Sequence, residues 1–455
     1  MYMNKISVSL VLCLLLMLLW GCQSTPVEQT VKTQNKDYLV DAPENDSVRY
    51  DAPERLSETK VLTDNLTIVY DAEIDIPYVS GYMVQAVRQK EFTDTEILNL
   101  IAYFCPGANL TEPVEATKSE IAQQIADLKE AHGSDDLDEQ TAGYLSYLEN
   151  QMETAPLESN SAPFDLTNIE TGGYYNAHAR NADETLSRFS GVRNGSSFCY
   201  VRDDRLSLYR QDILLPHEDA ELLKHYEEPF PVSETEAQAV AQSVVAELGF
   251  SDLRLLSSER ICSFIGNKVQ SKGWDFIFTR DNNGLQSYFS FNTISYGGVN
   301  VPLPTLCSPW GQEVLLLSVD AEGVLCFDLR NYEEYNGILR KNVKLCPWED
   351  LREQIEKQLF YHHAYSAEQS KYTTIRINDI MLRSATVNVF DDLDTGRTIP
   401  VWLIAYTYEA EIEKNIIMYT DCIYFNAIDG TYIEPRVPYE IWLEDLYDQQ
   451  FQREG

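Results

Sequence analysis

Histidine is the side chain best suited to proton transfer near neutral pH, so its positions are a first indication of chemistry. The six histidines of this chain are His132, His178, His217, His225, His362 and His363. None belongs to an H-E-x-x-H string. His362 and His363 fall at the predicted end of a helix, where a cation interacts favourably with the helix dipole. We therefore favour helix capping over a metal site for this pair.

Other patterns that carry chemistry are missing from the sequence. It contains no G-x-S-x-G, P-loop or G-x-G-x-x-G string. Asp391–Gly396 resembles the start of a calcium loop, but an EF-hand needs a glutamate six residues after its glycine, where this chain has Trp402. We expect a solvated hairpin turn there. The 72 acidic residues are enough to include a pair of carboxylates that catalyse hydrolysis. The sequence favours no particular two of them. We predict no catalytic residue, no cofactor and no metal.

The nine cysteines do not suggest a zinc site either, because none lies in C-x-x-C spacing. Seven remain when Cys13 and Cys22 are set aside, so at least one thiol is free or pairs between chains. Most have apolar neighbours, which is typical of buried free cysteines. These seven are Cys105, Cys199, Cys262, Cys307, Cys326, Cys346 and Cys422.

The amino terminus has the features of a secretory signal. A single cation, Lys5, precedes an apolar run, Val8–Trp20, that is shorter than the ~20 residues needed to span a bilayer. The ending Leu19-Trp20-Gly21-Cys22 resembles the lipobox of bacterial lipoproteins, although Trp20 departs from the small residue usual at its position. The resemblance implies cleavage of residues 1–21 and a diacylglyceryl anchor on Cys22. Two acyl chains would hold the protein stably on the extracytoplasmic face of the cell membrane.

The excess of acidic residues restricts the kinds of partner that we expect. With 35 basic residues against 72 acidic ones, the formal charge is -37. Nucleic-acid binding depends largely on lysine and arginine, so we expect no nucleic-acid partner. The apolar fraction of 44% is ordinary for a globular chain.

The pattern of apolar residues predicts an α+β fold. After a polar tether over residues 22–60, alternating residues at 66–76 predict a half-buried strand. Thr93 and Glu96 form a capping box for a helix that ends near Phe104. Two further helices are expected at 113–131 and 137–152. We assign residues 61–230 to an N-terminal α+β domain.

The second half of the chain repeats one pattern. A helix from Ser233 to about Leu248 precedes several strands, and a second helix, from Pro347 to about Tyr361, precedes several more. Trp274 matches Trp402 within the strands, and the two matching turns carry Asp320–Gly323 and Asp429-Gly430. We predict two tandem modules, each a helix covering an antiparallel sheet, at residues 231–335 and 336–455. The apolar spacing at 439–447 predicts a C-terminal helix in the second module.

This helix-and-sheet pattern resembles PepSY-like modules and the YycH and YycI type of extracytoplasmic regulator of sensor kinases. The closest matches are Pro400-Val401-Trp402 and Ile428-Asp429-Gly430. Over its whole length the chain resembles a group of uncharacterised lipoproteins of clostridial type. Their shared features are the lipobox, the Asp71–Ile74 strand and the helix starts at Glu91–Thr93 and Thr117–Ile121. The resemblance implies location and architecture and supplies no catalytic residue.

Three functional hypotheses follow. The first is a membrane-anchored, non-enzymatic protein that binds and regulates another protein of the cell envelope. The second is a lipoprotein that captures a peptide or a carbohydrate, suggested by the 28 tyrosines. The third and least favoured is a secreted hydrolase that uses carboxylates.

Overall fold

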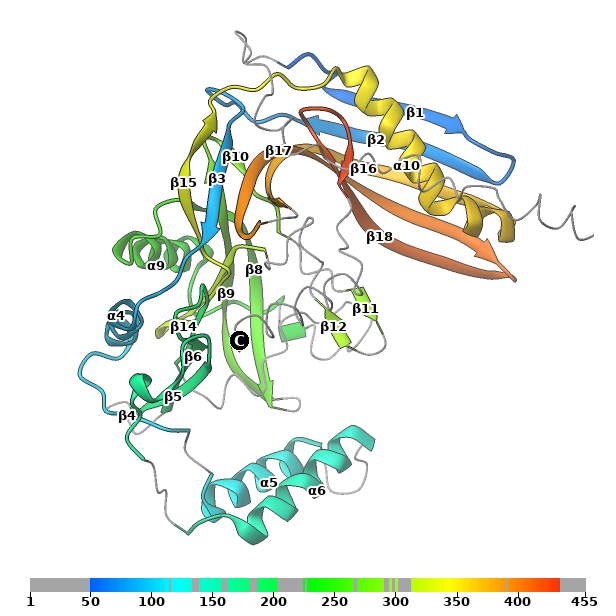
Figure 1. The fold of residues 1–455 in the computed structure, drawn as a ribbon. Coiled ribbons are helices and arrows are strands. Elements are labelled where there is room, and N and C mark those ends of the chain that lie inside the picture. The colour runs from blue at the N-terminus through cyan, green and yellow to red at the C-terminus, as the bar shows by residue number, and fades with distance from the viewer. Residues whose placement is uncertain are drawn as a thin grey trace, which may run out of the picture. The chain divides into compact units, whose positions relative to one another are not determined.

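The computed structural model describes residues 50–113, 116–132, 139–157, 162–180, 186–202, 224–225, 227–265, 268–289, 294–296, 299–301, 312–389 and 392–433. The predicted α+β class is confirmed, because this part of the chain forms five α-helices and two large sheets (Figure 1). None of its helices combines the length and the apolar character needed to cross a bilayer. The predicted signal peptide, Cys22, most of the predicted tether and the C-terminal helix expected at 439–447 lie outside the described residues.

The elements follow one another along the chain from a first strand pair to a long C-terminal meander. In order they are β1 (Arg55–Val61), β2 (Leu66–Asp75), β3 (Val84–Gln89), α4 (Asp94–Phe104), β4 (Leu110–Thr111), α5 (Lys118–His132), α6 (Glu139–Thr154), η1 (Leu166–Asn168), β5 (Tyr174–Arg180), β6 (Leu186–Val192), β7 (Phe198–Val201), α9 (Glu234–Glu247), β8 (Leu253–Ile265), β9 (Lys268–Asn282), β10 (Leu285–Gln286), β11 (Ile294–Tyr296), β12 (Val299–Val301), β13 (Val314–Asp320), β14 (Gly323–Arg330), β15 (Glu333–Arg340), α10 (Trp348–Gln369), β16 (Thr373–Val389), β17 (Asp392–Ile412), β18 (Asn415–Asn426) and β19 (Tyr432–Ile433).

The contacts divide the chain into two compact units. Unit 1 contains the described residues of Met1–Val84, Leu339–Arg383 and Ile399–Pro435, and unit 2 contains those of Gln85–Ile338 and Ser384–Thr398. The linear boundaries 61–230, 231–335 and 336–455 do not coincide with these units. The physical reason is strand pairing: β7, from the expected N-terminal domain, is hydrogen-bonded to β14, from the expected first module.

Unit 1 is built on the strand order β1-β2-β16-β17-β18-β19. Strands β2 and β16 run parallel, whereas β1–β2, β17–β18 and β18–β19 are antiparallel. Helix α10 lies on this sheet, where Tyr70 Oη donates to Glu356 Oε1 at 3.3 Å and His363 Nε2 lies 3.2 Å from Tyr406 Oη. Trp402 is fully buried here and packs edge-on against Trp348.

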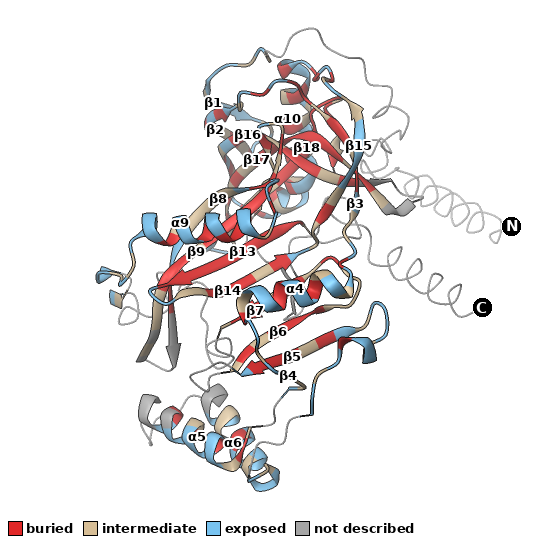
Figure 2. Cartoon of the chain, turned by 90° about the vertical axis from the view of Figure 1, so that its left-hand side faces the viewer, coloured by how far each residue is buried: buried red, intermediate tan, exposed pale blue. Residues whose placement is uncertain are grey.

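Unit 2 has the strand order β10-β9-β13-β14-β7-β6-β5-β4, with β8 paired to β9. Helices α4 and α9 cover the same face of this sheet, which is buried beneath them (Figure 2). Leu100 of α4 and Val244 of α9 share one apolar core with Phe276, Phe278 and Phe327 of the strands. Helices α5 and α6 form a separate hairpin around Ile121, Ile125, Leu128 and Leu148.

The predicted repeat is confirmed at the level of strand register. The series α9-β8-β9-β13-β14 recurs as α10-β16-β17-β18-β19. Trp274 pairs with Val319, just before Asp320, and Trp402 pairs with Phe425, just before Asn426. Asp320 and Asn426 each accept a hydrogen bond from the backbone nitrogen two residues later, at 2.9 Å. The two turns are therefore built by the same local bond.

The predictions for individual elements are confirmed in some cases and wrong in others. The strand at 66–76 and the capping box of Thr93 and Glu96 are confirmed. The helix expected to end near Tyr361 continues to Gln369, because His363 and Ala367 are buried on the sheet side of α10. The expected hairpin turn over Asp391–Gly396 is wrong for its described part, since Asp392–Gly396 begins β17 and Gly396 pairs with Val87.

Candidate binding site

The histidines singled out in the sequence do not form a common site in the described part of the chain. His178 lies on β5, and His225 lies 3.3 Å from Glu228. His362 and His363 lie inside α10, so the prediction that they cap the end of a helix is wrong. Burial lowers the pKa of His363 to about 4, so it is neutral at physiological pH. The described residues bring no three His, Cys, Asp or Glu side chains together as metal ligands.

Six of the cysteines lie in the described part of the chain, and none of them forms a disulfide bond there: Cys105, Cys199, Cys262, Cys326, Cys346 and Cys422. Burial raises the pKa of Cys262 to about 11 and that of Cys346 to about 12. Thiols held in the protonated form are poor nucleophiles, so neither is an activated catalytic cysteine. Cys22 and Cys307 lie outside the described residues.

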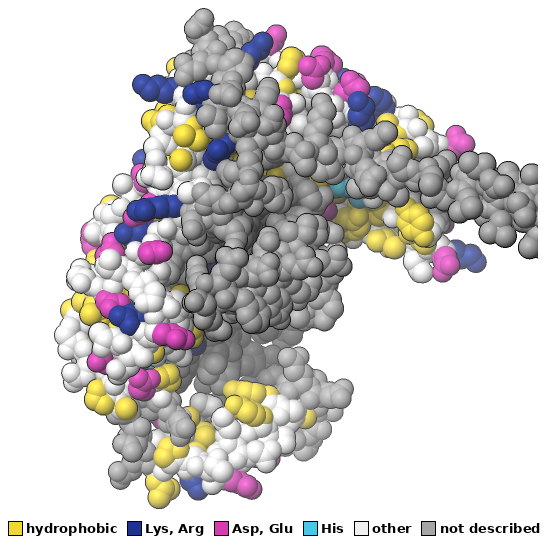
Figure 3. All heavy atoms as spheres, in the orientation of Figure 1, with side chains coloured by type: hydrophobic (Ala, Val, Ile, Leu, Met, Phe, Trp, Pro, Cys, Tyr) yellow, Lys and Arg dark blue, Asp and Glu magenta, His cyan; other side chains and the backbone are white. Residues whose placement is uncertain are grey.

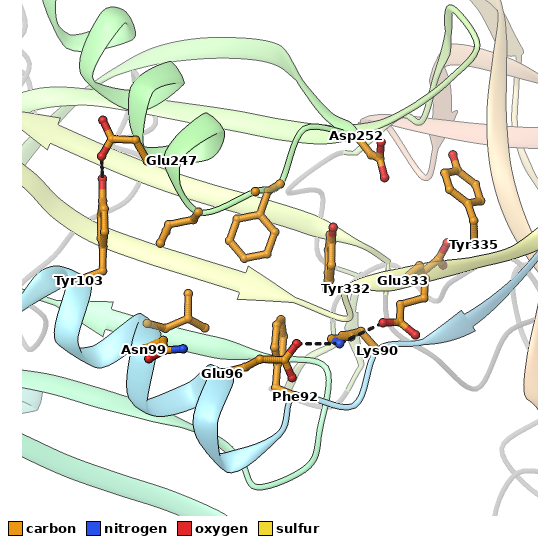
Figure 4. A pocket seen from close by; sticks show the side chains of 15 residues that line it. Lys90, Phe92, Glu96, Asn99, Tyr103, Glu247, Asp252, Tyr332, Glu333 and Tyr335 are labelled. Atoms are coloured by element: carbon orange, nitrogen blue, oxygen red, sulfur yellow. Dashed lines mark hydrogen bonds and ion pairs between the residues drawn. The ribbon is translucent and has the colours of Figure 1, made fainter.

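Unit 2 contains a pocket of about 810 Å³ between α4 and the segment that follows α9. Its size is that of a small-molecule or peptide site. Figure 4 shows Tyr103 and Glu247 at one end, and Asp252, Tyr332 and Tyr335 at the other. The lining residues combine apolar and aromatic groups with several carboxylates; they are Lys90, Phe92, Glu96, Asn99, Leu100, Tyr103, Glu247, Leu248, Gly249, Phe250, Asp252, Tyr332, Glu333, Glu334 and Tyr335.

Backbone hydrogen bonds fix the three segments that form the walls. Gly249 has φ +81°, a left-handed conformation that ends α9, and the Phe250 nitrogen then donates to the carbonyl of Val245 at 2.9 Å. This turn directs Phe250 to the pocket. The Lys90 nitrogen donates to the carbonyl of Tyr332 at 2.8 Å, which holds the end of β3 against the start of β15.

Aromatic rings make the floor of the pocket. Phe92 stacks on Tyr332 with 6.1 Å between ring centroids, and Phe250 meets the same tyrosine edge-on at 5.0 Å. Phe92, Leu100 and Phe250 are buried in the core of unit 2. Side chains packed in this way give a preformed surface, so a ligand would lose little energy in ordering it.

Charged groups line the rim. Lys90 Nζ lies 2.9 Å from a Glu96 oxygen and 3.0 Å from a Glu334 oxygen, so two carboxylates hold one cation (Figure 4). Tyr103 Oη donates to Glu247 at 2.7 Å, and burial together with this bond raises the pKa of the tyrosine to about 12. The rim is therefore acidic.

A buried ion pair lies behind the end of the pocket that Asp252, Tyr332 and Tyr335 form. Arg280 Nε donates to Glu313 Oε2 at 2.5 Å, and its Nη2 donates to the other oxygen of Glu313. Nη1 lies 3.3 Å from Asp252, at the pocket wall. The guanidinium also lies over the rings of Tyr332 and Tyr335, at 5.2 and 4.8 Å from their centroids. Arg280 thus fixes the positions of the pocket residues that touch it.

Glu333, at the same end of the pocket, is a buried carboxyl group with a strongly shifted pKa. Its side chain is buried, its backbone nitrogen donates to Glu313 at 2.8 Å, and its Oε2 accepts from Thr386 at 2.9 Å. Burial and the nearby charge of Glu313 raise the pKa of Glu333 to about 8. Burial and the neighbouring carboxylate therefore both favour the protonated form of Glu333, next to the Glu313 side chain that pairs with Arg280.

None of these residues was expected from the sequence to form a site. Arg280 closely follows the apolar residues Phe276–Phe278, and Tyr332 and Tyr335 flank two adjacent glutamates, so both segments carried a signal. Their partners lie far away in sequence, and the pocket becomes visible only when β3, β15, α4 and the end of α9 are brought together.

Comparison with known proteins assigns this chain to no family. No protein-family model matches the chain, and no curated protein matches it. Among solved structures, the chain is similar to an uncharacterized protein from Eubacterium rectale ATCC 33656, with 14% identity, a TM-score of 0.47, and coverage of 85% of this chain and 94% of that one. It is also similar to the YpeB C-terminal domain of Bacillus megaterium, with 11% identity, a TM-score of 0.30, and coverage of 76% of this chain and 97% of that domain.

Proposed function

We propose that this chain is a non-enzymatic lipoprotein of the cell envelope that binds a ligand in the pocket of unit 2. The observation that carries the proposal is the pocket itself, a cavity of about 810 Å³ with an aromatic floor and a polar rim. Such a combination is typical of sites that hold a ligand by apolar contact and orient it by a few polar groups. A short peptide is the favoured ligand, and a carbohydrate is the alternative.

The location of the protein is part of the same proposal. Leu19, Gly21 and Cys22 support cleavage before Cys22 and a diacylglyceryl anchor on its thiol. The experiment compares the wild-type chain with Cys22→Ala in a Gram-positive host. We expect the wild type in the membrane fraction and the variant outside it. Membrane retention of the variant would overturn the anchor.

Pocket binding is tested with two matched variants on one helix. Asn99 and Leu98 are neighbouring exposed residues of α4, but only Asn99 lines the pocket. Asn99→Trp should fill the cavity and abolish binding of acetylated tripeptide amides, measured by thermal shift and calorimetry. Leu98→Trp should bind them as the wild type does. Binding that survives Asn99→Trp would show that the ligand site lies elsewhere.

A second candidate function, binding of another envelope protein, is favoured by a different surface in unit 1. Four consecutive residues of β18, Ile416, Ile417, Met418 and Tyr419, are exposed to between 42 and 64%, and apolar side chains gather on this strand (Figure 3). Solvent-exposed apolar strands are typical of strand-to-strand association. We expect Met418→Asp to remove an in-cell crosslink to a membrane partner and to leave peptide binding unchanged. A crosslink that persists in this variant would exclude β18 as the contact.

A further inference from the structure

We propose that Cys199 and Cys326 are a redox-active thiol pair, which a small disulfide oxidant converts to a disulfide bond between β7 and β14. The inference goes beyond the proposed function and does not depend on the pocket, because the two thiols lie on the face of the unit 2 sheet opposite to α4 and α9. Three features carry it: the register of the two strands, the chemical surroundings of Cys199, and the unequal exposure of the two thiols.

The register of β7 and β14 places both thiols on one face of the sheet. Cys326 pairs with Val201, which lies two residues after Cys199, so the two cysteines are diagonal neighbours on adjacent strands. Tyr200 and Phe327, which alternate with them, are buried in the core under the helices. A hydrogen bond joins the two thiols, so the sulfur atoms are already neighbours.

Cys199 differs in acidity from other thiols of the described chain. Burial raises the pKa of four of them: Cys105, Cys262, Cys346 and Cys422. The pKa of Cys199 is instead lowered, above all by the hydrogen bond with the Cys326 thiol. Ser190, directly opposite Cys199 on β6, adds a second hydrogen bond. The thiolate is the form that attacks a disulfide, so Cys199 is the better nucleophile at neutral pH.

Charged groups on the same face of the sheet act on the pair. Arg188 on β6 favours the thiolate of Cys199, whereas Asp328 on β14 opposes it. Asp328 is itself paired with Arg330. Arg330 is also stabilised by the negative charge that either thiol acquires. The pair therefore lies beside two cations, and such surroundings are typical of reactive cysteines.

The exposure of the two thiols assigns them different roles. Cys199 is half-buried, whereas Cys326 is only 6% exposed. A dissolved oxidant therefore reaches Cys199 first, and Cys326 is the resolving thiol.

The reaction is a thiol–disulfide exchange in two steps. The Cys199 thiolate attacks one sulfur of the oxidant and forms a mixed disulfide, and the first half of the oxidant leaves as a thiolate that takes up the proton lost by Cys199. Cys326 then loses its proton, attacks the Cys199 sulfur and releases the second half as a thiol. Two protein thiols are oxidised to one disulfide, and one small disulfide is reduced to two thiols. The bond would hold β7 to β14 in an oxidising compartment.

The test uses the purified full-length chain, first reduced and then incubated with glutathione disulfide at pH 7. Remaining thiols are alkylated, and linked peptides are identified by mass spectrometry after digestion with trypsin and a protease that cleaves after glutamate. The second protease is needed because Cys307 and Cys326 share one tryptic peptide, with Glu313 and Glu322 between them. We expect the link between Cys199 and Cys326 to be at least tenfold more abundant than a link between any other two cysteines.

Three variants separate the roles of the two thiols. In Cys326→Ala, Cys199 should remain bonded to glutathione, because the resolving thiol is missing. In Cys199→Ala, Cys326 should remain reduced. Cys262→Ala is the matched control, since it removes a buried thiol of β8 in the same unit, and it should form the Cys199–Cys326 link as the wild type does.

Alkylation with iodoacetamide gives a second measurement that needs only the wild-type chain. The rate at Cys199 should reach half its maximum at a pH below the ordinary thiol pKa, whereas the rate at Cys262, whose pKa is about 11, should still be rising at pH 9. A half-maximum of Cys199 at or above the ordinary value would overturn its role as the attacking thiol. A wild-type chain in which glutathione stays on Cys199, or in which Cys199 does not react, would overturn the pair itself.

Discussion

The two helix-and-sheet repeats have the same strand order and the same turn chemistry, yet their interiors differ. In unit 1, Trp402 is fully buried against Trp348 of α10, and the buried polar groups of α10, Glu356 and His363, lie within hydrogen-bond distance of tyrosines of the sheet. In unit 2, the corresponding sheet contains a fully buried ion pair, Arg280 with Glu313, beside an open pocket. An ion pair buried away from water is weak evidence of stabilisation, since desolvation offsets much of the attraction. The difference therefore indicates that the buried pair of unit 2 serves to shape the pocket, whereas the buried polar groups of unit 1 bond within a packed interior.

The largest expected effect comes from breaking the buried pair. Arg280→Met should lower the free energy of unfolding by about 3–5 kcal/mol, because it leaves Glu313 buried without its cation. The matched change in unit 1 is Arg352→Met, at a side chain that is a quarter exposed and lies 3.3 Å from Glu356. That change should cost at most about 1 kcal/mol. Urea denaturation of the full-length chain, followed by circular dichroism, measures both.

A double variant sharpens this prediction. Replacing both partners, in Arg280→Met with Glu313→Met, removes the uncompensated charge and should restore most of the lost stability. It should also displace Tyr332 and Tyr335 and weaken ligand binding. Equal destabilisation by the single and double variants would show that packing, and not charge, is responsible.

The second effect tests the interior of unit 1. His363 has a folded-state pKa of about 4, against an ordinary value of 6.5, because burial disfavours its charged form. The unfolded chain therefore binds the proton more readily, so the stability that depends on neutral His363 is complete above pH 6.5. It is lost as the pH falls from 6.5 to 4, by about 3 kcal/mol at the lower limit.

The measurement is the unfolding free energy of wild type and His363→Gln at pH 7.5 and pH 4.5. Because other groups titrate in both proteins, the informative quantity is the difference between their pH dependences. We expect the wild type to lose more stability than the variant. Identical losses would show that His363 carries no such linkage.

Much of the fold could be predicted from the sequence because its signals are local. Thr93 with Glu96, and Ser233 with Glu236, are three residues apart and define helix starts by bonds within one turn. The Asp320 and Asn426 turns are equally local. The end of α10 was missed because burial of His363 and Ala367 against a distant sheet, and not a local signal, extends the helix.

The pocket could not be predicted in this way. Arg280 and Glu313 are 33 positions apart, and Glu333 binds Thr386 from 53 positions away. Alternation places polar residues on a strand face, but it does not say which strands become neighbours. Here Lys90, directly after β3, lies next to the start of β15, and this pairing of distant segments is encoded by no short-range pattern.

The third prediction concerns equivalent positions of the two repeats. Gly273 precedes Trp274 and pairs with Asp320, just as Val401 precedes Trp402 and pairs with Asn426. A Cβ at Gly273 would lie 2.3 Å from the backbone oxygen of Val319, so Gly273→Ala should cost about 1–3 kcal/mol through steric strain.

An alanine at Val401 should also destabilise the protein, but for a different reason. Val401 is fully buried, so Val401→Ala creates a cavity instead of a clash and should cost about 1–2 kcal/mol. A longer side chain separates the two cases in thermal denaturation. Gly273→Val should be worse than Gly273→Ala, whereas Val401→Ile should be tolerated better than Val401→Ala. Tolerance of Gly273→Val would show that the two repeats do not differ in backbone spacing here.

The smallest expected effect lies at the start of the repeat helices. Helix α9 begins with a capping box in which the Ser233 side chain accepts from the Glu236 nitrogen, whereas α10 begins at Pro347 without a side-chain cap. Ser233→Ala should lower the free energy of unfolding by about 1 kcal/mol, because the first-turn N–H groups lose an acceptor. Helix α10, with Trp348, Leu351 and Ile355 buried along one side, depends on packing instead. Pro347→Ala should therefore change stability less than Ser233→Ala, and amide hydrogen exchange in the first turn of each helix should show faster opening only in α9. An equal response of both helices would mean that packing, and not the cap, holds the start of α9 as well.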